Sequence, residues 1–235
     1  LKSFVLKEER IELAKRNKLD FNHIKELPLE LIETMETVKN YTKETNVLLD
    51  IGAHNGLFSA TANLFSSFDK TICFEPNTKL NDSIKSANTE INLKIENIAL
   101  SDKKGKAIFY LHEDSSMNSL VNSDNEVLKT EFPWDNPDLM NEIEVPTNTL
   151  DNYIEDRDLY NNLFFIKIDT QGNELNVLKN SLKTLKRTGV LLIEYMFVTP
   201  YDTDFSFLDL NNFLNENGFD CKGALTIFKR PSKKV

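Results

Sequence analysis

A glycine-containing turn is the first segment of the sequence whose residue types could bind a ligand. Residues 50–56 read Asp-Ile-Gly-Ala-His-Asn-Gly and follow a short apolar run. Glycines after a strand let the backbone approach a ligand, and the helix that follows offers free N–H groups. A dinucleotide site needs Gly-x-Gly-x-x-Gly, but His54 and Leu57 occupy its second and third glycine positions. The turn therefore suits a ligand with an amino acid moiety and no pyrophosphate, such as S-adenosylmethionine, although a tight turn without a ligand is the simpler alternative.

Glu75 is the second candidate, because it ends the next apolar run and is followed by Pro76. It lies 19 residues after Gly56, the usual distance between a glycine turn and an acid that binds a ribose. A carboxylate there can accept hydrogen bonds from both ribose hydroxyls. Taken alone, Glu75 could equally be an ordinary charge at a strand end. Together with the glycine turn it predicts a nucleoside-binding carboxylate.

A third segment, residues 165–174, combines an apolar strand, an acid and a second glycine turn. Asp169 ends the strand, and Glu174 opens the helix that should follow. In a doubly wound sheet this strand end faces the same crevice as the end of the first strand. That placement would bring Asp169 close to a ligand held by residues 50–56. The alternatives are structural: Asp169 could cap the helix, and Glu174 could interact with the helix dipole.

The hydrophobic periodicity predicts the elements that position these residues. Apolar stripes at helical spacing cover residues 5–45, so we expect residues 1–45 to form an N-terminal helical cap on a main domain of residues 46–235. We expect strands at 47–51, 71–75, 93–98, 106–111, 142–145, 163–168, 190–194, 219–222 and 225–229. We expect helices at 55–65, 78–87, 174–185 and 207–217. This order predicts an α/β fold with a doubly wound, mainly parallel sheet and an antiparallel C-terminal hairpin.

The composition excludes several classes of protein. The 235 residues include 28 Lys and Arg against 37 Asp and Glu, and the resulting net charge of -9 disfavours nucleic acid as a partner. No apolar run is long enough to span a membrane. Cys73 and Cys221 lie in strand-like contexts, so we expect two reduced core thiols and, by default, a cytoplasmic location. The scattered histidines show no zinc spacing, and we expect no metal site.

Six stretches, in order, resemble the FkbM-type S-adenosylmethionine-dependent methyltransferases. They are residues 50–56, Phe74–Asn77, Asn97–Asp102 with Gly105, Thr149–Asp151, Ile166–Glu174 with Val177 and Leu178, and Leu192–Glu194. The resemblance covers about two-thirds of the chain, roughly residues 46–195. His54 stands where the family usually has Asn, Asn55 where it has an apolar residue, and Thr170-Gln171 where it more often has Val-Glu.

The resemblance implies a class I methyltransferase (Rossmann-like) fold and S-adenosylmethionine as cofactor. It implies that residues 50–56 line the methionine end of the cofactor, through Asp50, Gly52, Ala53, His54, Asn55 and Gly56. It implies that Glu75, beside Pro76, holds the ribose, that Asn97 and Ala99 lie near the adenine, and that Asp169 faces the reacting centre. Members of this family mostly methylate hydroxyls of natural products and of sugars in surface polysaccharides, so the expected acceptor is a small molecule or a glycan.

Methyl transfer to a hydroxyl requires a nearby group that accepts the hydroxyl proton. The candidates are His54, His112, Asp169 and Glu194. His54 has a suitable pKa but sits in the cofactor turn, and His112 could equally be a surface residue. Asp169 and Glu194 both end central strands, which favours them on position. Two such acids do not make a convincing metal site.

Residues 112–140 form a polar segment too long for an ordinary connection, which indicates a lid or an acceptor-binding loop. It begins at His112, contains Ser116 within a serine-rich stretch, and includes Trp134. We expect these three residues to contact the acceptor. The alternative for Trp134 is that its ring pins the loop to the core.

Three other functions are weighed against this one. An NAD(P)-dependent oxidoreductase would need the intact glycine motif, which is absent. A nucleic-acid methyltransferase would need a basic groove, and amino-methylating types need an Asn/Asp-Pro-Pro-Tyr motif where residues 169–172 stand. A non-catalytic binding module on the same fold stays open. The oligomeric state is not predicted.

Overall fold

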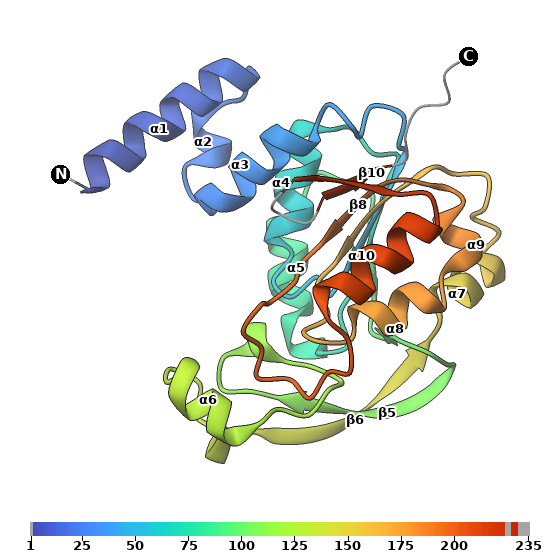
Figure 1. Ribbon diagram of the computed structural model, residues 1–235. Helices are drawn as coiled ribbons and strands as arrows, with labels where there is room; N and C mark the ends of the chain where they lie inside the picture. The colour runs from blue at the N-terminus through green and yellow to red at the C-terminus, as the bar shows by residue number, and fades with distance from the viewer. Residues whose placement is uncertain (1, 224–226, 230–235) are drawn as a thin grey trace.

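The computed structural model describes residues 2–223 and 227–229. Seven strands form the central sheet, in the order β3-β2-β1-β7-β8-β10-β9 (Figure 1). Their bounds are β1 Val47–Ile51, β2 Lys70–Phe74, β3 Leu93–Glu96, β7 Phe164–Ile168, β8 Thr188–Ile193, β9 Asp220–Gly223 and β10 Ile227–Lys229. The first five in this order are parallel, whereas β10 is antiparallel to both neighbours. The strand order therefore reverses between β1 and β7, where doubly wound sheets bind ligands.

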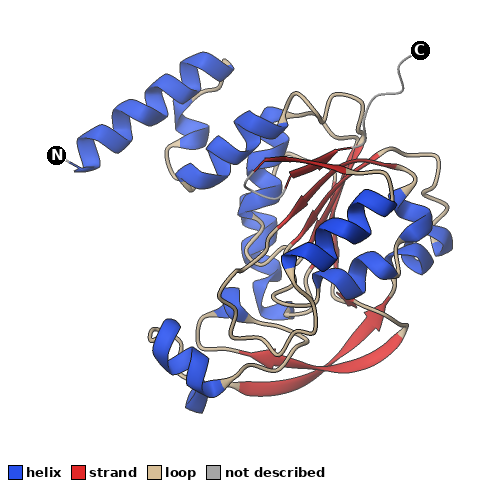
Figure 2. Cartoon of the chain, in the orientation of Figure 1, coloured by secondary structure: helices blue, strands red, loops and turns tan. Residues whose placement is uncertain are grey.

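Helices cover both faces of the sheet (Figure 2). One face carries α7 Leu150–Asp156, α8 Glu174–Lys179, α9 Leu182–Leu185 and α10 Phe207–Glu216, and the other carries α3 Leu29–Val38, α4 Leu57–Phe65 and α5 Asn81–Ala87. Successive strand residues point to opposite faces, so Leu49 packs in one core cluster and Leu48 in the other. The five residues of β1 and the five of β7 are all buried, as expected of central parallel strands. The predicted doubly wound α/β fold is confirmed.

Two predicted strands lie outside the central sheet. The segments predicted at 106–111 and 142–145 form β5 Gly105–Leu111 and β6 Asn141–Asn148, which pair antiparallel. With the two-residue strand β4 Ala99–Leu100 they form a separate sheet in the order β4-β6-β5. This sheet lies beyond the carboxyl ends of the central strands (Figure 1). It therefore forms one wall above the ligand-binding edge.

Other departures are local. The helix predicted at 174–185 is divided at Asn180 into α8 and α9, and α6 Asn125–Glu131 and α7 were not predicted. The predicted C-terminal hairpin is present as β9 and β10, although residues 225 and 226 of its last predicted strand lie outside the described part. Cys73 is a buried free thiol, as expected, but Cys221 is exposed and is therefore not a core residue.

The N-terminal region is helical but interrupted. It consists of α1 Lys2–Asn17, α2 Phe21–Ile24 and α3, where the sequence predicts helical structure from apolar stripes over residues 5–45. Met35 and Val38 of α3 pack against Phe58 and Ala62 of α4, whereas α1 extends away from the sheet (Figure 1). None of the helices in the described residues is long and apolar enough to cross a membrane.

Candidate active site

A cavity of about 390 Å³ opens at the carboxyl ends of the central strands. It lies between the glycine turn after β1, the ends of β2, β7 and β8, and the segment that follows β5. Of the residues singled out in the sequence, nine line it: Gly52, His54, Glu75, Pro76, Ala99, Ser116, Trp134, Asp169 and Glu194. Asp50, Ala53, Asn55, Gly56, Asn97 and His112 do not line it. The structure thus brings the three sequence segments together around one space.

The glycine turn needs its glycines for close packing. Gly52 has a φ of 75°, and a Cβ there would lie 1.8 Å from the carbonyl oxygen of Asp169. Gly56 has a φ of 79°, and a Cβ there would lie 2.9 Å from Cα of Ile84. Asn55 accepts a hydrogen bond from the N–H of Leu57, the first residue of α4. The glycine turn therefore packs directly against the backbone of Asp169 in the segment 165–174, which only glycine at position 52 allows.

Glu75 is buried at the cavity wall with both carboxylate oxygens in use. One oxygen accepts the backbone N–H of His54 at 2.9 Å, and the other accepts that of Asn77 at 2.9 Å. Each oxygen retains a lone pair, so the group can still accept hydrogen bonds from a ligand. Burial raises the pKa of Glu75 to about 7, against the lowering effect of these two N–H groups.

Asn97 supports Glu75 rather than the cavity. Its amide donates to the backbone carbonyl of Glu75 at 2.8 Å and exchanges two hydrogen bonds with the amide of Asn81. Ala53 likewise packs into a core cluster with Cys73 and Ile84. Neither residue lines the cavity, and both support the residues that do.

Lys167 is a buried cation beneath the cavity, and the sequence analysis assigned it no role. Its ammonium group donates to the carbonyl of Gly52 at 2.6 Å. It also lies 3.0 Å from Asp169 and 3.4 Å from Asp50. Asp50 is fully buried and accepts the Ser59 hydroxyl at 2.6 Å. Burial alone would lower the pKa of Lys167, but the charges of Asp169 and Asp50 raise it above its usual value.

Asp169 and Glu194 form an acid pair at the cavity wall. Burial favours the neutral form of Asp169, but Lys167 outweighs it and holds the pKa of Asp169 below its usual value. The charge of Asp169 is the main cause that raises the pKa of Glu194, whose side chain is exposed to the cavity, to about 8. The Gln171 amide bridges the two acids, at 2.7 Å from Asp169 and 2.8 Å from Glu194. At neutral pH one acid is therefore ionised and the other protonated.

The side chain of Glu174 has a structural role in the turn after β7. Its buried carboxylate accepts the backbone N–H groups of Thr170 and Gly172 and the Thr170 hydroxyl. It thus fixes the turn between β7 and α8 at the helix N-terminus.

The segment 112–140 lies over the ligand-binding edge, but it is not a structureless loop. It contains α6 and two short 3-10 helices at Ser115–Met117 and Pro137–Leu139. Trp134 lines the cavity while 61% exposed, so it does not pin the segment to the core. Ser115 hydrogen-bonds His54 across the cavity at 2.8 Å. In this pair, burial and the nearby Lys167 lower the pKa of His54.

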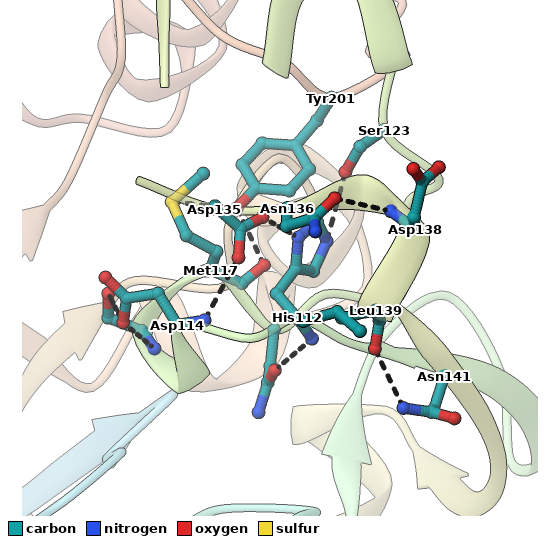
Figure 3. A network of polar contacts seen from close by, with 12 residues as sticks. His112, Asp114, Met117, Ser123, Asp135, Asn136, Asp138, Leu139, Asn141 and Tyr201 are labelled. Carbon is teal, nitrogen blue, oxygen red and sulfur yellow. Dashed lines mark hydrogen bonds and ion pairs between the residues drawn. The ribbon is translucent and has the colours of Figure 1, made fainter. Parts of the chain in front are cut away.

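His112 is buried and does not line the cavity, whereas the sequence predicts that it contacts the acceptor. Its Nδ1 lies 2.6 Å from Asp135, and its Nε2 lies 3.1 Å from the hydroxyl of Ser123 (Figure 3). The side chains of His112 and Asp135 are 0% exposed, so this Ser-His-Asp arrangement has no access for a substrate. The second oxygen of Asp135 accepts the Asp114 N–H at 3.0 Å. The three residues therefore hold the two halves of the segment together.

Several residues that line the cavity were not among the candidates named from the sequence. Apart from Gln171, these are mainly the contributions of segment 112–140 and of β5, namely Phe109, Asp114, Ser115, Met117, Asn118, Leu120 and Phe132. The signal for Lys167 was present, since it is the one charge within the apolar run Phe164–Ile168. Among the described residues, no group of three or more His, Cys, Asp or Glu side chains could hold a metal ion.

The doubly wound, mainly parallel sheet, with its glycine turn and crevice, defines an α/β protein of the Rossmann-like type. A family model described as "Methyltransferase FkbM domain" matches residues 50–221. The chain belongs to this FkbM methyltransferase family. No curated protein sequence matches the chain.

One solved structure is described as that of a putative RNA methyltransferase, PH1948, from Pyrococcus horikoshii. It shares 14% sequence identity with a TM-score of 0.41, over 81% of this chain and 68% of that chain. A likeness at that level carries no conclusion about function.

Proposed function

We propose that this protein is an S-adenosylmethionine-dependent methyltransferase that transfers the methyl group to a hydroxyl of a small natural product or a glycan. The observation that carries the proposal is the shared cavity, in which Glu75 and the acid pair Asp169–Glu194 face one space. Glu75 would serve the nucleoside, and the acid pair would serve the reacting hydroxyl. Membership of the FkbM family supports methyl transfer as the reaction class.

The cavity suits S-adenosylmethionine better than a dinucleotide. Its charged lining residues are acids, namely Glu75, Asp114, Asp169 and Glu194, and among the described residues it has no lysine or arginine lining. An acidic wall favours a cationic sulfonium and disfavours a pyrophosphate. Phe74, Ile98, Leu100 and Phe109 supply an apolar wall for a purine. Gly52, His54 and Glu75 would hold the cofactor, which supplies a methyl group already activated by its positive charge.

The acid pair would handle the acceptor proton. Asp169, kept ionised by Lys167, is placed to accept a hydrogen bond from the acceptor hydroxyl and orient it. Glu194 has a pKa of about 8, close to neutral pH, which suits a group that removes a proton. We propose that the hydroxyl proton passes to this pair, with Asp169 orienting and Glu194 accepting. His54 is less suited to serve as the base, because burial and the nearby Lys167 lower the pKa of its ring.

The acceptor would bind beneath segment 112–140. Trp134 offers an exposed ring at the cavity, and Ser116 offers a hydroxyl, a combination that suits the C–H face and hydroxyls of a sugar. The acidic wall disfavours phosphorylated or carboxylated acceptors. A cytoplasmic location belongs to the same proposal, supported by the free thiols of Cys73 and Cys221.

Calorimetry with S-adenosylhomocysteine, S-adenosylmethionine and NAD tests the proposal before any acceptor is known. We expect binding of the first two and none of NAD. Tight binding of NAD alone would favour an oxidoreductase. Binding of none of the three would favour a non-catalytic module.

A further inference from the structure

Gln171 has a backbone conformation that its residue type disfavours. Its φ is 55°, in the left-handed region, and it is followed by Gly172, which also has a positive φ of 95°. For an unbranched residue such as Gln this conformation carries an energetic cost, and strained residues of this kind concentrate at functional sites. The strain places the side chain between the ends of β7 and β8. A turn needed only for chain reversal would be better served by glycine.

The side chain of Gln171 makes contacts that explain the strain. Its Nε2 group has two hydrogens, and it lies 2.7 Å from Asp169 Oδ1 and 2.8 Å from Glu194 Oε2. Each acid therefore receives one N–H from the same amide. The other end of the amide, Oε1, is buried and has no hydrogen-bond partner among the described residues. The contacts with the two acids thus fix the direction of the amide, at the cost of an unpaired oxygen.

The backbone of Gln171 is tied to the segment over the cavity. The hydroxyl of Ser119 donates to its carbonyl oxygen at 2.6 Å. Ser119 is fully buried, and its hydroxyl also accepts the N–H of Val121 at 2.8 Å. The conformation that aims the amide at the acids is therefore the one that segment 112–140 holds in place.

We propose that Gln171 is a positioning residue that holds Asp169 and Glu194 as a hydrogen-bonded pair, and that Ser119 of the covering segment keeps it in this conformation. The inference rests on the proposed function in so far as the pair handles the acceptor proton. The effect of the amide on the ionisation of the two acids does not depend on turnover. An amide that donates to both carboxylates favours their ionised forms, so its removal makes them harder to ionise.

Other titratable groups surround the pair and must be held constant in the test. They are Lys167 on β7, Asp50 on β1, His54 in the turn after β1, Asp114 before the first 3-10 helix, Glu174 at the start of α8, and Tyr201. None of them is changed in the variants below.

The test is NMR titration of the Glu194 side-chain carboxyl in the wild type and in Gln171→Gly. Glycine accepts the positive φ and keeps the carbonyl that Ser119 binds, so the variant should fold with unreduced Tm. Without the amide, we expect the pKa of Glu194 to rise above the wild-type value. We expect kcat to fall roughly tenfold or more, the loss of a hydrogen bond to a charged group. Ser119→Ala keeps the amide but removes the hydrogen bond that holds the backbone of Gln171, so we expect a smaller rise in the pKa of Glu194 than in Gln171→Gly. No rise in Ser119→Ala would show that Ser119 does not hold Gln171 in place.

Several results would overturn the proposal. An unchanged pKa of Glu194 in folded Gln171→Gly would show that the amide does not act on the pair. Failure of Gln171→Gly to fold would show that the side chain is needed for the structure itself. If the wild type binds no S-adenosylhomocysteine, the proposed function fails, whereas the titration still decides whether Gln171 controls the acids.

Discussion

The ammonium group of Lys167 lies 3.0 Å from the carboxylate of Asp169, two residues farther along the chain and just past the end of β7, and 3.4 Å from the buried carboxylate of Asp50. Residues two apart on a strand share a face, so this pairing follows from the sequence Lys-Ile-Asp itself. The cation neutralises charge beneath the cavity and keeps Asp169 ionised. It thereby connects the glycine turn, through the carbonyl of Gly52, to the acid pair.

Removal of this cation should destabilise the fold. Lys167→Met leaves the carboxylate of Asp50 buried without its ion pair, a change that typically costs about 3–5 kcal/mol. Urea unfolding would measure the difference. Lys183→Met is the matched control, because Lys183 makes an exposed pair with Glu155, and exposed pairs contribute little. Equal stability of the two variants would contradict a central role for Lys167.

Asp169→Asn keeps the size of the side chain and removes its charge. We expect kcat to fall roughly 10²-fold or more, the scale of a well-placed acid–base group. Affinity for S-adenosylhomocysteine should change much less, because Glu75 lies elsewhere in the cavity. Initial rates with an acceptor found by screening hydroxyl compounds, together with calorimetry, separate the two effects. Near-normal turnover would reduce Asp169 to a structural residue.

The pH dependence of kcat should report Glu194. A carboxyl group with a pKa raised to about 8 is mostly protonated below that pH and cannot take another proton. The rate should therefore rise as pH increases toward about 8 and then level off. In Glu194→Gln this limb should vanish along with most of the activity. A limb that persists in Glu194→Gln would assign the proton transfer to another group.

The central strands could be predicted from sequence because their signal is local. Short runs such as Phe164–Ile168 are apolar except for Lys167 and end in an acid or a glycine turn, which places Asp169 and Glu75 at one edge. The pairing of β5 with β6 spans a long insertion and has no such signal, so its separation from the main sheet was not foreseen. Tertiary pairing, rather than periodicity, decides such cases.

Contacts between side chains that are distant in the sequence could not be predicted either. His112 looked like an acceptor-facing base because nothing nearby indicates that Asp135, 23 residues later, and Ser123 occupy both ring nitrogens. The sequence likewise gives no sign of a role for Gln171, since its contact with Glu194 also spans 23 residues. Such roles depend on which segments the fold brings together.

The side chain of Trp134 should contribute to binding of the acceptor and not to binding of the cofactor. Trp134→Ala removes the exposed ring at the cavity, so the acceptor KM should rise several-fold with little change in S-adenosylhomocysteine affinity. Leu139→Ala is the control, because Leu139 is similarly exposed on the same segment but does not line the cavity. Equal KM values for the two variants would show that Trp134 does not contribute to acceptor binding.

The affinity of S-adenosylhomocysteine for Glu75→Ala tests the central claim most directly. Charge-assisted hydrogen bonds to a ribose contribute about 1.5–3 kcal/mol, so calorimetry should show affinity lowered roughly ten- to a hundredfold. Glu44→Ala, at an exposed glutamate outside the cavity, should bind as the wild type does. A Glu75→Ala protein that is folded, by its circular dichroism and Tm, and that binds S-adenosylhomocysteine with wild-type affinity would contradict the assignment of this cavity to the nucleoside.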